Sequence, residues 1–220
     1  MGLRINTNVS ALNAARTLQR STLSLNKSLQ RLSSGLRINQ AADDAAGLAI
    51  AEGFRSVVRG SQVSQRNAQD GVSLVQTAEG ALSETTNILQ RIRELAVQAS
   101  NGTQSTNNRT ALHTEVRQLL AQIDDIALDT QFNGINVLSS SQTVTLQTGA
   151  FTSQTLNVSV QGAKTSDLKV SPVAVSTYVL AVSAISTIDN ALQSVNSLRS
   201  TLGAFQNRLE FTINTLAIQE

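Results

Sequence analysis

The residue types that most often carry catalysis or bind metals are scarce in this sequence. It contains no cysteine, and His113 is its one histidine. Without thiols, a disulfide framework and a thiolate metal site are both excluded. A lone histidine argues against a histidine-rich metal cluster and against a Ser-His-Asp triad. Since the sequence also lacks an HExxH motif and a glycine-rich phosphate loop, we expect no enzymatic activity, no metal site and no cofactor.

Two pairs of adjacent carboxylates could in principle bind a metal, but each has a simpler interpretation. Asp43 and Asp44 precede an apolar run, where a carboxylate can accept from free N–H groups and meets the positive end of a helix dipole. No further ligands lie near this pair in the sequence, so we interpret it as a helix cap. Asp124 and Asp125 fit a solvated helix face, and we expect His113 to face solvent near a helix start.

Composition narrows the class of protein further. The 17 Lys and Arg against 15 Asp and Glu give a net charge of +2, too small an excess to bind nucleic acid by charge alone. No apolar stretch reaches the roughly 18 residues of a membrane span, and no continuous apolar region follows Met1, so we expect neither membrane insertion nor a Sec-type signal peptide. Residues 1–42 contain no acid and in that respect mimic a transit peptide, but we do not favour that interpretation because the same residues follow a regular heptad pattern. Six aromatic residues and one proline favour thin helical rods over an enzyme with a deep pocket.

The elements that position these residues are long helices with coiled-coil spacing. Residues 11–36 alternate steps of four and three between apolar or small positions, which averages 3.5 residues and predicts a coiled-coil seam. Gly35 can end that helix, because glycine tolerates the left-handed conformation. The positions of this first seam are Ala11, Ala15, Leu18, Thr22, Leu25, Leu29, Leu32 and Leu36.

A second and longer seam follows the carboxylate pair and ends before the stop signal Asn101-Gly102. A helix of about 55 residues would be roughly 80 Å long. Many of its seam positions are small, which favours close approach of neighbouring helices. The seam positions are Ile50, Phe54, Val57, Ser61, Ser64, Ala68, Gly71, Val75, Ala78, Leu82, Thr85, Leu89, Ile92, Ala96 and Ala99. A shorter helix with apolar positions from Leu112 to Ile126 follows a short loop, so we expect it to be an antiparallel neighbour.

The remaining third of the chain combines a small β element with a last long helix. Asn133-Gly134 predicts a turn, and residues 143–148 and 155–160 alternate in polarity as strands do. A linker over 161–172 precedes a helix that begins at Val173 and stays periodic to Glu220, where we expect the chain to be cut in mid-helix. The predicted fold class is therefore mainly α, an elongated coiled-coil helical bundle with a small β-hairpin element.

The first helix has no obvious partner left in this chain. An isolated helix of that length is only marginally stable in water. Its apolar stripe must then be disordered or covered by another molecule, which indicates a polymer or an obligate assembly.

Six motifs in order resemble bacterial flagellins, over about 140 N-terminal and about 35 C-terminal residues. They are RINTNVSALNA (4–14), LQRLSSGLRINQAADDAAGLAIAE (29–52), RNAQDGVSLVQTAEGAL (66–82), QRIRELAVQ (90–98), TQFNGINVL (130–138) and NSLRSTLGAFQNRLEFTINTL (196–216). The resemblance implies a D0-like inner-tube helix at 1–44, the N-terminal D1 helices and β element at 45–172, and the C-terminal D1 helix at 173–220. It also implies a minimal flagellin without the outer D2 and D3 domains, and with the C-terminal D0 helix missing.

The resemblance implies an extracellular structural subunit of the bacterial flagellum, which self-assembles into a helical filament for swimming motility. Its partners would be copies of itself, the flagellar type III export apparatus, and cap and junction proteins. Since the family's export chaperone binds the C-terminal region that we expect to be missing, that partnership is in doubt. The predicted assembly and core seam residues are Leu18, Leu25, Leu29, Leu32, Leu82, Leu89, Leu192 and Leu202.

The resemblance also implies recognition by the innate immune receptor Toll-like receptor 5. The similar residues are Gln90, Arg91, Glu94 and Leu95, with Glu115 on the facing helix. Helical offsets of three and four place Arg91, Glu94 and Leu95 on one patch, with a guanidinium beside an apolar anchor. The alternative interpretation is that this patch only forms the subunit–subunit surface of the filament.

Three other functions stay open at this point. A hook–filament junction protein would share the terminal helices. An enzyme could use a flagellin-like scaffold, although no inserted domain is present to carry it. A coiled-coil adaptor would bind helices of other proteins.

Overall fold

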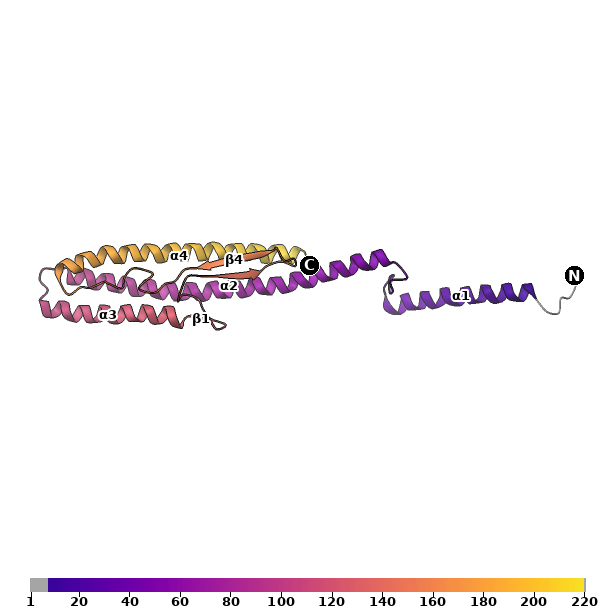
Figure 1. Ribbon diagram of the computed structural model, residues 1–220, viewed down its shortest axis with the longest axis horizontal. Helices are drawn as coiled ribbons and strands as arrows, with labels where there is room; N and C mark the ends of the chain where they lie inside the picture. The colour runs from indigo at the N-terminus through magenta and orange to yellow at the C-terminus, as the bar shows by residue number, and fades with distance from the viewer. Residues whose placement is uncertain (1–7, 220) are drawn as a thin grey trace. The chain divides into compact units, whose positions relative to one another are not determined.

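The computed structural model describes residues 8–219, which divide between Val57 and Val58 into two compact units. Each unit is described by itself, and residues 4–7 of the first motif and Glu220 lie outside the described residues. The predicted mainly α fold with a small β element is confirmed (Figure 1). The described elements are α1 (Val9–Ser34), α2 (Ala45–Ala99), α3 (Thr106–Asp129), β1 (Gln131–Phe132), β2 (Ile135–Asn136), β3 (Gln142–Gln147), β4 (Thr155–Val160) and α4 (Tyr178–Ile218).

Helix α1 has a defined beginning and end. The Asn8 side chain accepts a hydrogen bond from the Ala11 amide at 3.1 Å, and so satisfies one of the free N–H groups of the first turn. At the other end Gly35 adopts a φ of +69°, the left-handed conformation that the sequence predicts there.

The segment between α1 and α2 is tied back to the end of α1. Asn39 donates from its side-chain amide to Ser34 Oγ at 2.7 Å, and the Asp43 carboxylate lies 2.6 Å from Lys27 Nζ. Asp44 accepts from the Gly47 amide at 2.9 Å, so the predicted cap of the second helix is confirmed for Asp44. Asp43 has a different role, because it is held by α1.

In the second unit α2 and α4 run antiparallel. Arg93 Nε lies 2.7 Å from Asp189 Oδ1, and Arg199 Nη2 lies 3.6 Å from Glu79 Oε1. The residue numbers rise along one helix as they fall along the other, which fixes the direction. One apolar core runs through this unit, and the predicted α2 seam is buried from Ser61 to Ala99.

Helix α3 packs on the same core and is joined to α2 by a short turn. Arg109 donates from Nε to the Ala99 carbonyl at 2.8 Å and from Nη2 to the Asn101 carbonyl at 3.0 Å. This guanidinium therefore satisfies a free carbonyl at the end of α2 and also binds the turn that follows it. Val116 and Ile123 of α3 are fully buried, as expected for an antiparallel neighbour.

Small residues let the elements of this unit approach closely. At Gly71 an added Cβ would press against Leu146 Cδ1 of β3 and would lie 3.3 Å from Leu209 Cδ1 of α4. Side chains of two elements converge on the α2 backbone at this point, so an added methyl group would force them to shift.

Two small antiparallel hairpins complete the unit. Asn133 and Gly134 have φ values of +50° and +78° and join β1 to β2, as the predicted turn requires. Strand β4 has the predicted bounds and buries Leu156, Val158 and Val160, while β3 begins and ends one residue earlier than predicted.

The connection from β4 to α4 differs from the prediction. Helix α4 begins at Tyr178, not at Val173, because the Thr177 side chain caps it by accepting from the Leu180 amide at 3.4 Å. The apolar residues Val173 and Val175 are buried without being helical. They pack into the core from the connecting segment. In the sequence their apolar pattern cannot be distinguished from the first turn of a helix.

Candidate assembly interface

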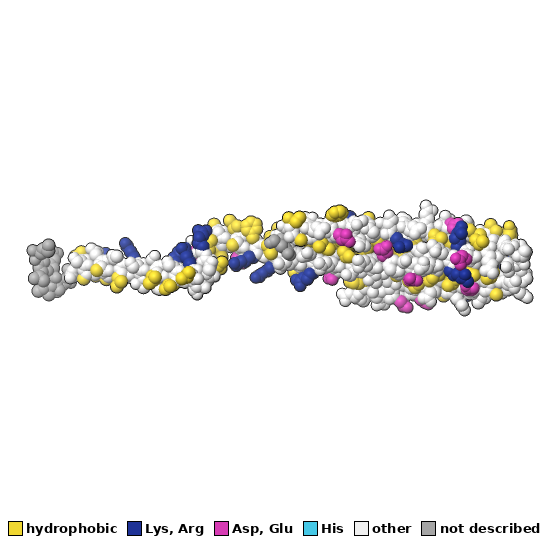
Figure 2. All heavy atoms as spheres, turned by 180° about the vertical axis from the view of Figure 1, so that it is seen from behind, with side chains coloured by type: hydrophobic (Ala, Val, Ile, Leu, Met, Phe, Trp, Pro, Cys, Tyr) yellow, Lys and Arg dark blue, Asp and Glu magenta, His cyan; other side chains and the backbone are white. Residues whose placement is uncertain are grey.

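Helix α1 carries an uncovered apolar surface. None of its 26 residues is buried, and yellow side chains follow this helix in Figure 2. Its heptad leucines are exposed by half or more of their surface. The predicted assembly residues among them are exposed as follows: Leu18 70%, Leu25 59%, Leu29 52% and Leu32 81%.

The first part of α2 is uncovered in the same way. Ile50 is 60% and Phe54 68% exposed, although both lie on the seam that is buried from Ser61 onward. The seam therefore changes from uncovered to covered along one continuous helix. An apolar stripe at heptad spacing is suited to packing against another helix.

The other four predicted seam leucines serve the core of the second unit. Leu82, Leu89 and Leu202 are buried, and Leu192 is half-buried and packs against the same core. These residues hold the bundle together and present little surface to another molecule.

The segment before α2 carries the clearest electrostatic perturbation in the first unit. The hydrogen bond from Lys27, followed by that from the Asn39 amide, lowers the pKa of Asp43 below its ordinary value. Arg31 adds to the effect from 3.9 Å. Asp43 therefore stays ionised and fixes the chain direction where α1 ends.

The predicted receptor residues divide into an exposed cluster and a core residue. Arg91 Nη2 lies 3.0 Å from Glu115 Oε1 and Arg91 Nη1 lies 3.1 Å from Glu94 Oε2. The hydrogen bonds from Arg91 to Glu115 and Glu94 raise the pKa of the guanidinium. Gln90 is exposed beside them. Leu95 is only 1% exposed, so the prediction of an exposed apolar anchor at this position is wrong.

Two residues that we expected to be solvated have contacts instead. Asp124 accepts from the amide and the hydroxyl of Thr165, both at 2.8 Å, and so holds the connection between β4 and α4 against α3. His113 is half-buried and its Nδ1 accepts from the Val175 amide at 3.5 Å. Sequence gave no signal for either contact, because the partners are 41 and 62 residues away.

Among residues 8–219 no group of three or more metal-binding side chains occurs, and no described helix is long and apolar enough to cross a membrane. A hollow of about 440 Å³ lies open beside His113 and Arg117. The arrangement is suited to non-covalent packing.

Comparison with known proteins identifies the family of this chain. Residues 5–143 match the bacterial flagellin N-terminal helical region, and residues 185–220 match the bacterial flagellin C-terminal helical region. The chain belongs to the bacterial flagellin family. In this flagellin the described residues between β4 and α4 form one short connection without a helix or strand, as expected for a member without outer domains.

Relatives at substantial identity extend over most of this flagellin. It is 46% identical over 215 residues to a flagellin of Halalkalibacterium halodurans, covering 96% of this chain and 79% of the relative. It is 43% identical over 226 residues to the flagellar filament 33 kDa core protein of Treponema phagedenis, covering 95% and 79%. The crystal structure of Bacillus cereus flagellin matches with a TM-score of 0.59 at 32% identity, covering 69% of this chain and 88% of that one. These names favour a filament subunit over a junction protein.

Proposed function

We propose that this flagellin is the structural subunit of the flagellar filament and that copies of it polymerise by covering the apolar stripe of α1. One observation carries the proposal: a 26-residue helix with heptad leucines has no buried residue. The first part of α2, with Ile50 and Phe54, extends the uncovered surface.

Burial of this stripe supplies the driving force for assembly. Moving a leucine side chain fully out of water contributes about 1.5–3 kcal/mol, and α1 presents several of them at helical spacing. Association costs translational and rotational freedom, so the leucines must be covered together. Contacts between different faces of identical subunits do not close, and they therefore generate an open fibre.

The substitution Leu32→Asp tests the proposal, because it places a charge in the stripe at its most exposed leucine. We expect loss of polymerisation in light scattering and electron microscopy, with unchanged monomer helicity by circular dichroism. Gln19→Asp is the matched control, since it adds the same charge at an exposed polar position of the same helix. Normal filaments from Leu32→Asp, or equal loss in both variants, would contradict the proposal.

We infer the remaining partners from the family. The flagellar type III export apparatus would deliver the subunit to an extracellular filament, and cap and junction proteins would meet the filament at its ends. The division into an inner-tube segment 1–44 and D1 segments 45–172 and 173–220 belongs to the same proposal. Co-purification of tagged flagellin with these components from flagellated cells tests it, and failure to recover any of them would count against it.

Toll-like receptor 5 is a second proposed partner, through the ion-pair cluster of Arg91, Glu94 and Glu115 with the exposed Gln90. The cluster joins α2 to α3 and its side chains are about half exposed. Leu95 would contribute only by holding Arg91 in place from the core. In a reporter-cell assay we expect Arg91→Ala to weaken activation relative to Arg117→Ala, and equal activity would contradict the proposal.

A further inference from the structure

Charges of opposite sign are separated along this chain. Residues 1–66 contain nine basic and three acidic side chains, whereas residues 67–220 contain eight basic and twelve acidic ones. On the face drawn in Figure 2, dark blue side chains gather over α1 and the first part of α2, and magenta ones lie mainly over the helical bundle. The net charge of +2 is therefore the sum of a positive region and a negative region of the chain.

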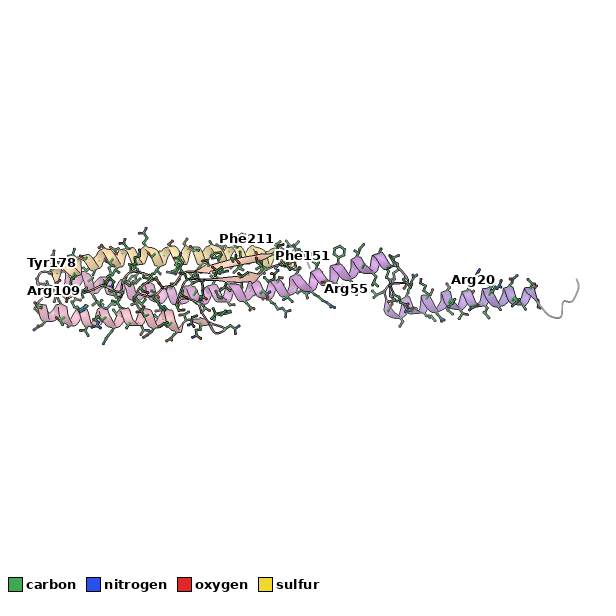
Figure 3. All side chains as sticks on the ribbon, in the orientation of Figure 1. Arg20, Arg55, Arg109, Phe151, Tyr178 and Phe211 are labelled. Carbon is green, nitrogen blue, oxygen red and sulfur yellow. The ribbon has the colours of Figure 1, made fainter. Side chains whose placement is uncertain are left out.

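The positive region includes a stripe on α2 that faces away from the core. Arg55, Arg59 and Arg66 are exposed, and their spacing of four and seven residues places them on one helix face. Ser61 and Ser64, which are buried, lie on the opposite face. Arg55 is paired with Glu52 at 2.6 Å and projects from the helix in Figure 3. Arg59 and Arg66 have no ion-pair partner among the described residues.

The negative region includes a groove between α2 and α3. Its hollow measures about 330 Å³, and Glu84 of α2 and Asp125 and Asp129 of α3 line it. All three carboxylates are exposed, and none has an ion pair or hydrogen bond to another described side chain. Ala81 and Ile126 also line it. The groove thus combines unpaired carboxylates with apolar side chains.

The stripe and the groove cannot meet within one copy. Arg66 and Glu84 lie on the same continuous helix, 18 residues apart, which corresponds to about 27 Å along its axis at 1.5 Å per residue. Folding them together would require breaking α2 in its buried part. Contact between the two surfaces therefore requires a second copy.

We propose that the acidic groove of one subunit, formed by Glu84, Asp125 and Asp129, binds the Arg59 and Arg66 stripe of a second copy in the filament. This inference rests on the proposed polymerisation and names an additional contact in it. Each copy carries both surfaces at different places, so the contact is heterologous and propagates without closing. Opposite potentials also accelerate encounter and fix the register of the partners.

The test compares critical concentrations for polymerisation of the full chain. The variant Arg59→Glu/Arg66→Glu should raise the critical concentration about tenfold, which corresponds to about 1.4 kcal/mol. The variant Asp125→Arg/Asp129→Arg should do the same. Combining all four substitutions re-creates complementary charges, so it should restore polymerisation to near that of the parent.

Matched controls separate this contact from the proposed function. Arg117→Glu/Lys169→Glu makes the same change in net charge at exposed positions outside the stripe and should polymerise like the parent. Circular dichroism verifies that every variant is folded. Failure of the four-fold variant to recover, or equal loss in the Arg117 and Lys169 control, overturns the inference. Failure of the parent chain to polymerise at all contradicts the proposed function instead.

Salt offers an independent measurement on the unaltered protein. Raising NaCl from about 50 mM to about 500 mM shortens the screening length severalfold, so the critical concentration should rise. The Arg59→Glu/Arg66→Glu variant should lose most of that dependence. An equal salt dependence in both proteins would overturn the inference.

Discussion

Helix α1 and the later part of α2 carry the same kind of heptad seam but differ in what covers it. In α2 the seam from Ser61 to Ala99 packs against α3, α4 and β4, whereas in α1 every described position is solvent-accessible and none is buried. A periodic apolar pattern thus predicts which face of a helix will pack. Whether the cover comes from the same chain depends on the number and length of the other helices.

The comparison can be tested most strongly by truncating one leucine in each region. Leu89 is fully buried and Leu32 is 81% exposed. We expect Leu89→Ala to lower the free energy of unfolding by about 2–5 kcal/mol, because a cavity remains in the core. Leu32→Ala should change it by less than about 0.5 kcal/mol in the monomer. Urea unfolding followed by circular dichroism measures both, and similar losses would contradict the assigned difference in coverage.

Two glycines of α2, one in its covered part and one in its uncovered part, test the same difference in coverage, with smaller expected changes in stability. We expect Gly71→Ala to cost about 1–3 kcal/mol, since the new methyl group would press on Leu146 and Leu209. Gly53 has no atom within 4 Å of an added Cβ, so Gly53→Ala should stabilise the helix by about 0.5–1 kcal/mol. Opposite signs in thermal unfolding are the expected result, and a stabilising Gly71→Ala would show that the elements do not converge there.

The smallest expected effect concerns the tie between α1 and the segment before α2. The pKa of Asp43 is lowered by Lys27 and the Asn39 amide, so the ionised form is favoured in the folded chain. Its stabilising contribution is complete above pH about 4, where the unfolded chain is ionised too. It is lost as the pH falls through the lower folded-state pKa.

The Asn39 backbone amide reports this titration by NMR, because it donates to Asp43 Oδ2 at 3.3 Å. We expect its chemical shift to change with a midpoint below 3.8, the ordinary aspartate value. Asp43→Asn is the control and should abolish the change. A midpoint at or above the ordinary value would contradict the ion pair.

Features encoded by local residue types were predictable from sequence. Gly35 ends α1 and Asn133-Gly134 forms a turn with positive φ, because few other residues adopt that conformation. The burial of the α2 seam from Ser61 followed from its period. The predicted helix start at Val173 was wrong. Val173 and Val175 are buried in a non-helical segment, and in the sequence such apolar residues cannot be told apart from those on the buried face of a helix.

Contacts between distant segments were not predictable. Leu95 is in the core and not on the receptor-like patch. Asp124 binds Thr165 rather than solvent. The two-residue strands β1 and β2 are too short to show alternation. In each case the deciding partner is fixed by the tertiary fold.

The start of α4 at Tyr178 has a practical consequence for spectroscopy. The chain has one tyrosine and no tryptophan, and this ring is 54% exposed at the first residue of the helix. Ultraviolet fluorescence excited at the tyrosine band therefore originates from one known point of the molecule, apart from weak phenylalanine emission. Any change in its intensity or anisotropy during polymerisation will report on the surroundings of that helix end without an attached dye.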